Sequence, residues 1–339
     1  MVTASPLPDQ FSERGDWLVQ AIDPRARLAR LVRMDGDAYR GASFLDDRLL
    51  PNAADSRLCS LDDVVASAAR IEWRPAGWIF HIGHVGSTLV SRLLGELDGV
   101  LSLREPRSLR DLAVASDDER PALALALGKL MGRGLVPGQT VLIKATSFVS
   151  EYAPLLVAPG APVLFMFAHP RRYIEGILAG ENSVSELRAL AGERVGRLSG
   201  RRITLPGLDA NDAHLAAAAW LCEMTSLEAA ADMMSTDQLM WADFDGMLAD
   251  MGGALARITA HFAIKAGRDA IDAIVAGPLM RRYSKAQEYD YSPALRAQLL
   301  AEAGRSHRAE IDAALASLGA AAAQFPLAAR ALQRAEGEI

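Results

Sequence analysis

Five short runs of apolar residues recur through the middle of the chain, and polar or turn-forming residues bound each of them. The runs occupy residues 78–82, 100–103, 141–143, 163–167 and 239–242. Short continuous runs that are rich in aromatic and β-branched residues are typical of strands buried on both faces. We therefore expect these segments to form a mainly parallel central sheet.

Apolar residues at helical spacing separate these runs. The clearest helix is predicted to begin at Ser87, because Leu89, Leu93, Leu94 and Leu97 fall on one face. Similar patterns predict helices over 109–131, 173–179 and 212–234. Strands that alternate with helices indicate βαβ units, so the fold class is α/β with helices covering both faces of the sheet.

The two ends of the chain differ from this core. Residues 1–74 are predicted to be a helical or loop-rich lead-in, with helical spacing around residues 17–22 and a helix from Ser60, a good N-cap, to Arg70. From Met251 onward the chain is alanine-rich, which predicts helices interrupted near 277–278 and 292–293. We expect one α/β domain over 75–339 with a helical C-terminal segment.

Composition narrows the class of partner. The 339 residues carry 36 basic and 42 acidic side chains, a formal charge of −6, which argues against binding to duplex nucleic acid. Cys59 and Cys222 are far apart and lack the spacing of a zinc site or a disulfide framework. No apolar run is long enough to span a bilayer and the start carries no leader pattern, so we expect no membrane contact and a cytoplasmic location.

A glycine-containing loop joins the first core strand to its helix. It reads His81-Ile82-Gly83-His84-Val85-Gly86-Ser87-Thr88. Backbone N–H groups at such a turn, together with a helix N-terminus, can bind a phosphate or sulfate. The Walker A pattern is not met, because no lysine precedes Ser87-Thr88. The alternative is that the glycines only relax the backbone and the hydroxyls only cap the helix.

Polar residues also follow the other core strands. They are Glu105, Lys144, His169 with Arg171, and Asp243. In open α/β sheets ligands bind beyond the carboxyl ends of the strands, so these groups are predicted to gather around one crevice. The alternatives are that strand ends are simply solvated, and that Glu105 pairs with a neighbouring arginine such as Arg104.

Four segments, taken in order, resemble the sulfotransferase family. Phe80 to Leu94 is similar to its phosphosulfate-binding loop and leucine-rich helix, and 103–106 (LREP) resembles the R-E-P segment of bacterial members. Residues 163–178 (VLFMFAHPRRYIEGIL) resemble the strand with its R-x-P-[RK] turn and helix. Residues 241–244 (WADF) resemble the Y-E-[DN]-L stretch. The resemblance covers about residues 75 to 265.

The resemblance implies a P-loop type three-layer sandwich and a sulfotransferase-like enzyme. Its donor would be 3′-phosphoadenosine 5′-phosphosulfate, without a metal, and its acceptor a hydroxyl or amine of a small molecule or peptide. From its own residues, the chain offers Glu105 as the best candidate base, and Lys144, with His84 when protonated, could stabilise charge on the transferred group. The donor would be held by the loop residues and by four others: Gly83, His84, Val85, Gly86, Ser87, Thr88, Arg171, Arg172, Ser284 and Lys285.

The chain also departs from the family pattern at several positions. His84 stands where the family has its basic loop residue, and Ala168 where it has the arginine that contacts the 3′-phosphate. Thr146 stands in place of the histidine of K-x-H. Gly83 and Gly176 replace a proline and a serine, respectively. Two further functions therefore stay open. One is a nucleotide-dependent kinase or NTPase with Mg²⁺ on Asp243 or Glu105. The other is a non-catalytic member that binds a nucleotide or a partner protein.

Overall fold

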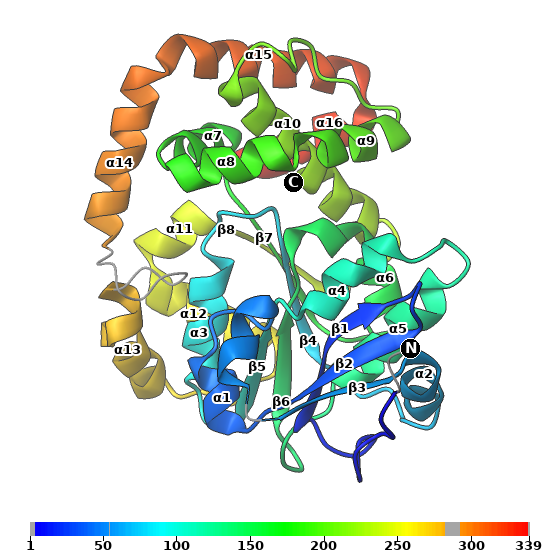
Figure 1. Ribbon diagram of the computed structural model, residues 1–339. Helices are drawn as coiled ribbons and strands as arrows, with labels where there is room; N and C mark the ends of the chain where they lie inside the picture. Colours follow the sequence, from blue (N-terminus) through cyan, green and yellow to red (C-terminus); the bar gives the residue numbers. More distant parts are fainter. Residues whose placement is uncertain (1–3, 54, 282–291, 338–339) are drawn as a thin grey trace.

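Two β-sheets organise the chain (Figure 1), which a computed structural model describes over residues 4–53, 55–281 and 292–337. The central sheet has five parallel strands in the order β5-β6-β4-β7-β8. All five predicted runs are strands of this sheet, so the expected parallel α/β core is confirmed. The strands are β4 (Gly77–His81), β5 (Val100–Arg104), β6 (Thr140–Lys144), β7 (Val163–Phe167) and β8 (Leu239–Asp243).

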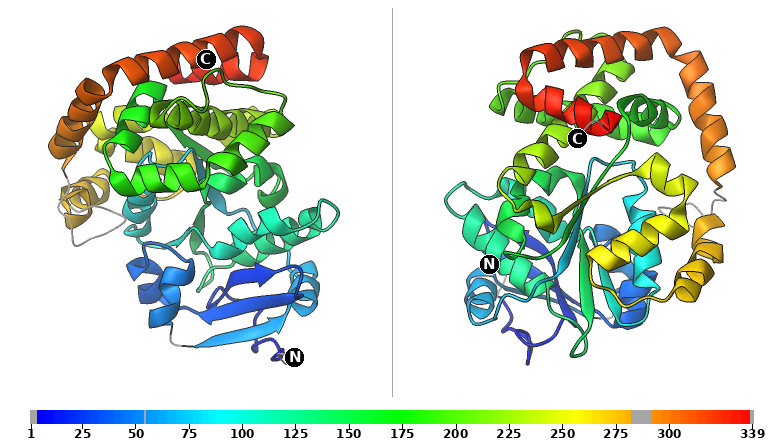
Figure 2. Two further views of the ribbon diagram at one scale, coloured as in Figure 1. Left: turned by 45° about the horizontal axis from the view of Figure 1, so that its top comes forward. Right: turned by 180° about the vertical axis from the view of Figure 1, so that it is seen from behind.

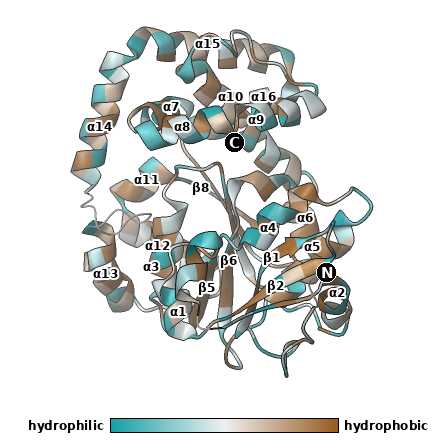
Figure 3. Ribbon diagram, in the orientation of Figure 1, coloured by the Kyte–Doolittle hydropathy of each residue, from teal (hydrophilic) through white to brown (hydrophobic). Residues whose placement is uncertain are grey.

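Strand β4 lies at the centre of the sheet and fixes where a ligand site can form. After β4 the chain adds β5 and β6 on one side, and it then returns to add β7 and β8 on the other. Such a reversal opens a crevice at the carboxyl ends of the strands. The five residues of β4 are buried, and Figure 3 shows the central strands as mostly hydrophobic, as expected for a sheet covered on both faces.

Helices cover both faces of the central sheet, which completes the expected three-layer sandwich (Figure 1). One side carries α3 (Ser87–Gly95), α11 (Phe244–Ala249), α12 (Met251–His261) and α13 (Arg268–Ala276). The other carries α4 (Arg107–Asp111), α5 (Arg120–Met131) and α6 (Ala153–Leu156). The single helix predicted over 109–131 is wrong: the 3₁₀ helix η2 (Leu112–Val114) and the polar residues 116–119 separate α4 from α5.

A second group of helices lies over the carboxyl ends of the strands (Figure 2). It contains the long buried helix α10, around which the others pack, and it includes the predicted helical C-terminal segment. The breaks expected near 277–278 and 292–293 are present, since α13 ends at Ala276 and Ser292 caps α14. The members are α7 (Pro170–Leu178), α8 (Glu181–Ala189), α9 (Ala191–Gly200), α10 (Asp212–Ala231), α14 (Pro293–Ser306), α15 (Arg308–Gln324) and α16 (Pro326–Glu336).

The N-terminal region contains a three-stranded antiparallel sheet, so the expectation of a helical or loop-rich lead-in is wrong there. Its strands are β1 (Trp17–Asp23), β2 (Leu28–Arg33) and β3 (Ser56–Ser60). The register of β1 shifts between Val19 and Ala21, and this irregularity makes its apolar positions resemble a helical spacing. The region also holds α1 (Gly36–Gly41), the 3₁₀ helix η1 (Asp47–Asn52) and the predicted helix α2 (Leu61–Ala69), capped by Ser60.

Segment 39–45 of this region covers β5, which lies at one edge of the central sheet. The Leu45 N–H donates to the carbonyl oxygen of Arg104 (2.7 Å), and the Arg104 guanidinium donates to the carbonyl oxygens of Tyr39 and Ala42. Burial lowers the pKa of Arg104 to about 9. The edge strand that leads to Glu105 is therefore held by backbone groups of the N-terminal region.

A search of the described residues finds no helix with the length and apolar character needed to cross a membrane.

Candidate functional site

A cavity of about 1130 Å³ lies at the carboxyl ends of the central strands. Small-molecule pockets typically measure about 300–1,000 Å³, so a nucleotide together with part of a second molecule fits this volume. Helices α7, α8, α9 and α14 form the opposite wall. The polar residues that line it include His81, His84, Ser87, Thr88, Glu105, Arg107, Arg110, Lys144, Thr146, Ser147, Ser183, Glu186, Arg194 and Arg296.

The glycine loop after β4 forms the floor of this cavity. Gly83, His84 and Gly86 have left-handed backbone conformations, with φ of 82°, 54° and 63°, and α3 begins directly afterwards at Ser87. A non-glycine residue such as His84 adopts this conformation only at some cost, and such strain is concentrated at functional sites. Of the predicted loop residues, Val85 packs in the core, while Gly83, His84, Gly86, Ser87 and Thr88 line the cavity.

The conformation at Gly86 leaves no room for a side chain. A Cβ built on Gly86 would lie 2.0 Å from the Phe244 ring, whose helix α11 follows β8. The close approach brings the aromatic ring against the backbone that begins α3. Both the positive φ and this contact require glycine at position 86. From the sequence, only the strand-to-helix turn could indicate this requirement, because the contact with Phe244 depends on the fold.

Glu105 and Lys144 form an ion pair at the ends of the adjacent strands β5 and β6. The Lys144 side chain is buried. The Glu105 side chain is about 20% exposed and lines the cavity. Glu105 has φ of 51°, the second strained non-glycine residue at this site. Its predicted neighbours Arg104 and Arg107 pair elsewhere, with backbone carbonyl groups and with Asp111 (3.3 Å) respectively.

His81 links this ion pair to the glycine loop. Its Nε2 lies 2.9 Å from the carbonyl oxygen of Ala145 and 3.8 Å from the Glu105 carboxylate. Its Nδ1 accepts the backbone N–H of Gly83 at 3.0 Å. An acceptor role for Nδ1 leaves the proton on Nε2, which donates to Ala145. The last residue of β4 thereby fixes the start of the loop relative to Glu105.

His84 points from the loop toward α8. Its Nε2 lies 3.7 Å from the Glu186 carboxylate, and its ring meets the Tyr173 ring edge-on at 6.5 Å. Burial raises the pKa of the Tyr173 phenol, so this hydroxyl stays neutral. His84 therefore lies at the cavity surface between an acidic and an aromatic side chain.

Several predicted residues lie away from the cavity lining. Arg171 pairs with Asp312 of α15 (2.7 Å) and Arg172 with Glu175 (3.1 Å). His169 is exposed, and its Nδ1 accepts the Arg171 N–H at 3.3 Å, so it caps α7. Ser284 and Lys285 fall outside the described residues.

Asp243, the proposed alternative magnesium ligand, caps α11. Its Oδ2 accepts the Gly246 N–H at 2.7 Å, and burial raises the pKa of its carboxyl group. Glu105, the other candidate ligand, is already paired with Lys144. Within the described ranges, no group of three or more His, Cys, Asp or Glu side chains is placed to hold a metal ion.

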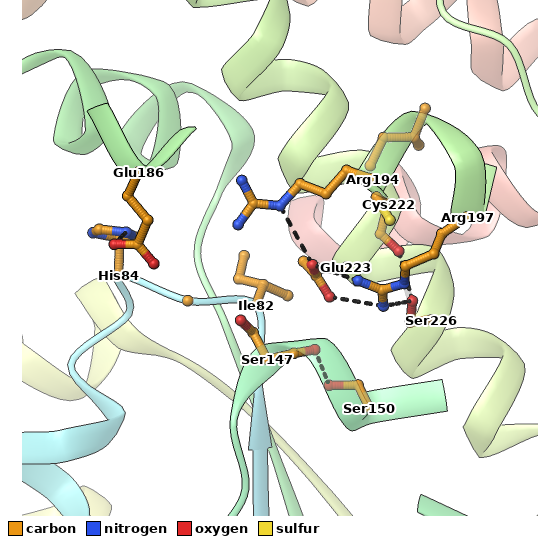
Figure 4. Close-up of polar contacts among 12 residues, drawn as sticks. Ile82, His84, Ser147, Ser150, Glu186, Arg194, Arg197, Cys222, Glu223 and Ser226 are labelled. Atoms are coloured by element: carbon orange, nitrogen blue, oxygen red, sulfur yellow. Dashed lines mark hydrogen bonds and ion pairs between the residues drawn. The ribbon is translucent and has the colours of Figure 1, made fainter. Parts of the chain in front are cut away.

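Two of the cavity-lining arginines that were not expected from the sequence come from the helical layer. Arg296 of α14 pairs with Asp245 and lies over the Phe244 ring, with its Cζ 5.2 Å from the centroid. Arg194 of α9 is buried and faces the cavity near His84 and Ser147 (Figure 4). Both lie far along the chain from the strand ends, so no local motif signals them. Only packing of the helical layer over the sheet brings them to the site.

Comparison with known proteins finds only distant likenesses. No protein-family model matches the sequence, and no curated protein matches it. The chain is similar to the sulfotransferase domain from the curacin biosynthetic pathway at 12% identity and TM-score 0.43, over 65% of this chain and 85% of that one. It is also similar to the sulfotransferase domain of the Synechococcus PCC 7002 olefin synthase at 15% identity and TM-score 0.41, over 68% and 88%.

A third similar structure is a sulfotransferase from Alicyclobacillus acidocaldarius, at 14% identity and TM-score 0.33, over 70% of this chain and 96% of that one. Each of the three TM-scores is below 0.5, so these likenesses carry no argument about this chain.

Proposed function

We propose that the chain is a sulfotransferase-like enzyme that uses 3′-phosphoadenosine 5′-phosphosulfate and transfers its sulfuryl group to a hydroxyl or amine. One observation carries the proposal: the glycine loop at the start of a helix and a carboxylate–ammonium pair open onto the same cavity. The loop is Gly83 to Thr88 at the start of α3, and the pair is Glu105 with Lys144. Sulfuryl transfer needs these two elements, a cradle for the phosphosulfate and a base beside it.

The loop binds the donor through its backbone and hydroxyl groups. The N–H groups at the start of α3 carry the positive end of the helix dipole and favour an anion. Ser87 and Thr88 line the cavity at the first two positions of the helix, where their hydroxyls can donate to phosphosulfate oxygens. This binding requires no lysine in the loop, which agrees with the absence of the Walker lysine.

Glu105 and Lys144 divide the chemistry of transfer. The acceptor oxygen or nitrogen forms a bond to sulfur as the bond between sulfur and the bridging phosphate oxygen breaks, and adenosine 3′,5′-bisphosphate leaves. Glu105 takes the acceptor's proton. Protonation neutralises the carboxylate that was paired with Lys144, so the ammonium charge becomes available to the departing phosphate. The ion pair thus couples removal of the proton to stabilisation of the leaving group.

Calorimetry tests the proposal against its alternatives. The protein should bind adenosine 3′,5′-bisphosphate in buffer containing EDTA, and it should bind ATP with Mg²⁺ more weakly. Binding of ATP with Mg²⁺ alone would favour a kinase or NTPase instead. Binding of neither nucleotide would leave only the non-catalytic interpretation, with a partner protein as ligand.

A further inference from the structure

Arg194 extends its guanidinium into the cavity although the residue is only 4% exposed. Its Nε faces the Glu223 carboxylate at 3.5 Å, and Figure 4 shows its two terminal nitrogens on the opposite side, toward His84. None of the described residues accepts a hydrogen bond from Arg194, and its buried Nε is left without one. A buried guanidinium with unused donors is costly unless an anion completes its shell.

The surrounding charges do not neutralise Arg194. Glu223 is fully buried and accepts two hydrogen bonds from Arg197, at 2.9 and 3.1 Å. Glu151 pairs with Arg201 (2.6 Å) and with Arg197 (3.4 Å). Three guanidiniums, those of Arg194, Arg197 and Arg201, therefore share two carboxylates, and the cluster carries a net positive charge.

Arg110 and Arg194 both lie beside the ring of Phe148. The Cζ atoms of Arg110 and Arg194 lie 5.2 and 5.5 Å from the centroid of Phe148, and all three residues line the cavity. Arg110 is exposed and makes no ion pair with the described residues. Nearby Val114 also lines the cavity and is 58% exposed, which adds an apolar surface.

Arg110, Val114 and Phe148 lie on the side of the cavity where the base lies, and Arg194 reaches the Phe148 ring from α9 in the opposite wall. Arg110 and Val114 follow Glu105 after β5, and Phe148 follows Lys144 after β6. The glycine loop, where the donor is proposed to bind, follows β4. A ligand group between Arg110 and Arg194 would therefore belong to the acceptor.

We propose that Arg194 and Arg110 form a subsite for a carboxylate or phosphate of the acceptor, beside the apolar surface of Phe148 and Val114. The acceptor is then an organic anion with an apolar body and a separate hydroxyl or amine that receives the sulfuryl group. The planar guanidinium of Arg194 matches the two oxygens of such an anion. The assignment to an acceptor rests on the proposed function, whereas the anion subsite itself does not.

Binding of matched pairs of probes tests the subsite. We would titrate 4-hydroxybenzoate, 3-hydroxyoctanoate and the methyl ester of each, with 4-hydroxyphenyl phosphate as the phosphate probe, with and without saturating adenosine 3′,5′-bisphosphate. The anions should bind at least about tenfold more tightly than the esters, because charge-assisted hydrogen bonds are lost with the charge. Comparing the affinity for the phosphate probe with that for the carboxylate probes then identifies which anionic group the subsite prefers.

Two variants test whether the preference for anions over esters depends on Arg194 and Arg110. Arg194→Gln should reduce the preference for anions to about twofold or less, and Arg110→Gln should reduce it partly. Arg110 is exposed, so that variant tests the proposal even if Arg194→Gln fails to fold. Arg188→Gln is the control, because Arg188 is exposed on α8, pairs with Asp212 and does not line the cavity. Thermal unfolding checks that each variant is folded.

The outcomes separate this proposal from the proposed function. Equal binding of anions and esters to the wild type, or an unchanged preference in both variants, would overturn the subsite. If Arg194→Gln instead weakens adenosine 3′,5′-bisphosphate, Arg194 belongs to the donor site and the acceptor subsite is wrong. If the wild type binds no nucleotide but keeps an Arg194-dependent preference for anions, the subsite stands and the sulfotransferase proposal fails.

Discussion

Lys144 and Glu105 are joined twice, once through their side chains and once through their backbones. The ammonium pairs with the carboxylate, and the Glu105 N–H donates to the Lys144 carbonyl oxygen at 2.8 Å. The second bond fixes the backbone at the residue that leaves β5 with a positive φ. The carboxylate is therefore placed by the parallel sheet itself, which makes it suited to a role that needs a fixed position.

Replacing Glu105 by glutamine should reduce turnover about 10²- to 10⁴-fold, the usual contribution of a general base. Glutamine keeps the size of the side chain but cannot take the acceptor's proton. Binding of adenosine 3′,5′-bisphosphate should persist, because the glycine loop holds it. Turnover would be measured with labelled donor, and binding by calorimetry.

A matched control for this variant is Glu193→Gln, since Glu193 is exposed on α9 and does not line the cavity. That protein should turn over like the wild type. If Glu105→Gln is less stable yet has normal turnover per folded molecule, Glu105 serves only as a structural partner of Lys144.

Gly86→Ala should abolish nucleotide binding and destabilise the protein more than the same change at Gly99. Both glycines have positive φ, 63° and 74°, but a Cβ meets the Phe244 ring only at Gly86, while nothing lies within 4 Å at Gly99. The left-handed conformation alone costs about 1–2 kcal/mol. Urea unfolding measures the difference between the variants. Equal losses of stability would show that Phe244 moves aside.

Arg296→Gln should weaken adenosine 3′,5′-bisphosphate about tenfold or more, if one charge-assisted hydrogen bond is lost. Arg296 lines the cavity, whereas Arg171 and Arg172 are engaged by Asp312 and Glu175 outside its lining. A double Arg171→Gln, Arg172→Gln variant is the comparison, and calorimetry is the measurement. A larger loss of affinity in the double variant would show that Arg171 and Arg172, and not Arg296, contact the donor.

The stability of the protein should fall as the pH rises from about 9 to about 11, in part because of Cys222. Burial, with Glu223 nearby, raises the pKa of this thiol from 9.0 to about 11. In that range the unfolded chain has lost the proton and the folded chain keeps it, so unfolding becomes easier as pH rises. The expected change is on the order of 2–3 kcal/mol.

Urea unfolding of the wild type and of Cys222→Ala at several pH values isolates this contribution. The curve of unfolding free energy against pH should be flatter for the variant between pH 9 and 11. Parallel curves for the two proteins would mean that Cys222 ionises equally in both states.

The central sheet was predictable because its strands are buried on both faces. Runs such as 163–167 have no polar position to alternate with, so composition and length alone identify them. The N-terminal sheet was missed because β1 is irregular at Val19 and Ala21, and its pattern is not that of a regular strand. The apolar pattern along a segment reflects which residues are buried. In an irregular strand the buried residues do not alternate regularly, so the pattern does not indicate a strand.

The site was predictable only where it lies next to a strand. Gly83, Glu105 and Lys144 lie at or just after the ends of central strands, so their order in the sequence predicted that they share one edge of the sheet. Arg194 and Arg296 come from helices that pack over that edge after long excursions of the chain, and no spacing rule connects them to it. The expected partners of the donor, Arg171 and Arg172, follow a strand, but Arg171 pairs with Asp312 of α15 and Arg172 with Glu175 of its own helix.

The cover that segment 39–45 provides for β5 has a consequence for folding and solubility. An uncovered edge strand presents free N–H and C=O groups to any other extended chain, and it is a common start of aggregation. A chain that began at residue 75 would expose the outer edge of β5, together with the Arg104 guanidinium that now donates to Tyr39 and Ala42. The N-terminal region therefore acts as an intramolecular shield, and its removal should cause self-association before it affects any chemistry in the cavity.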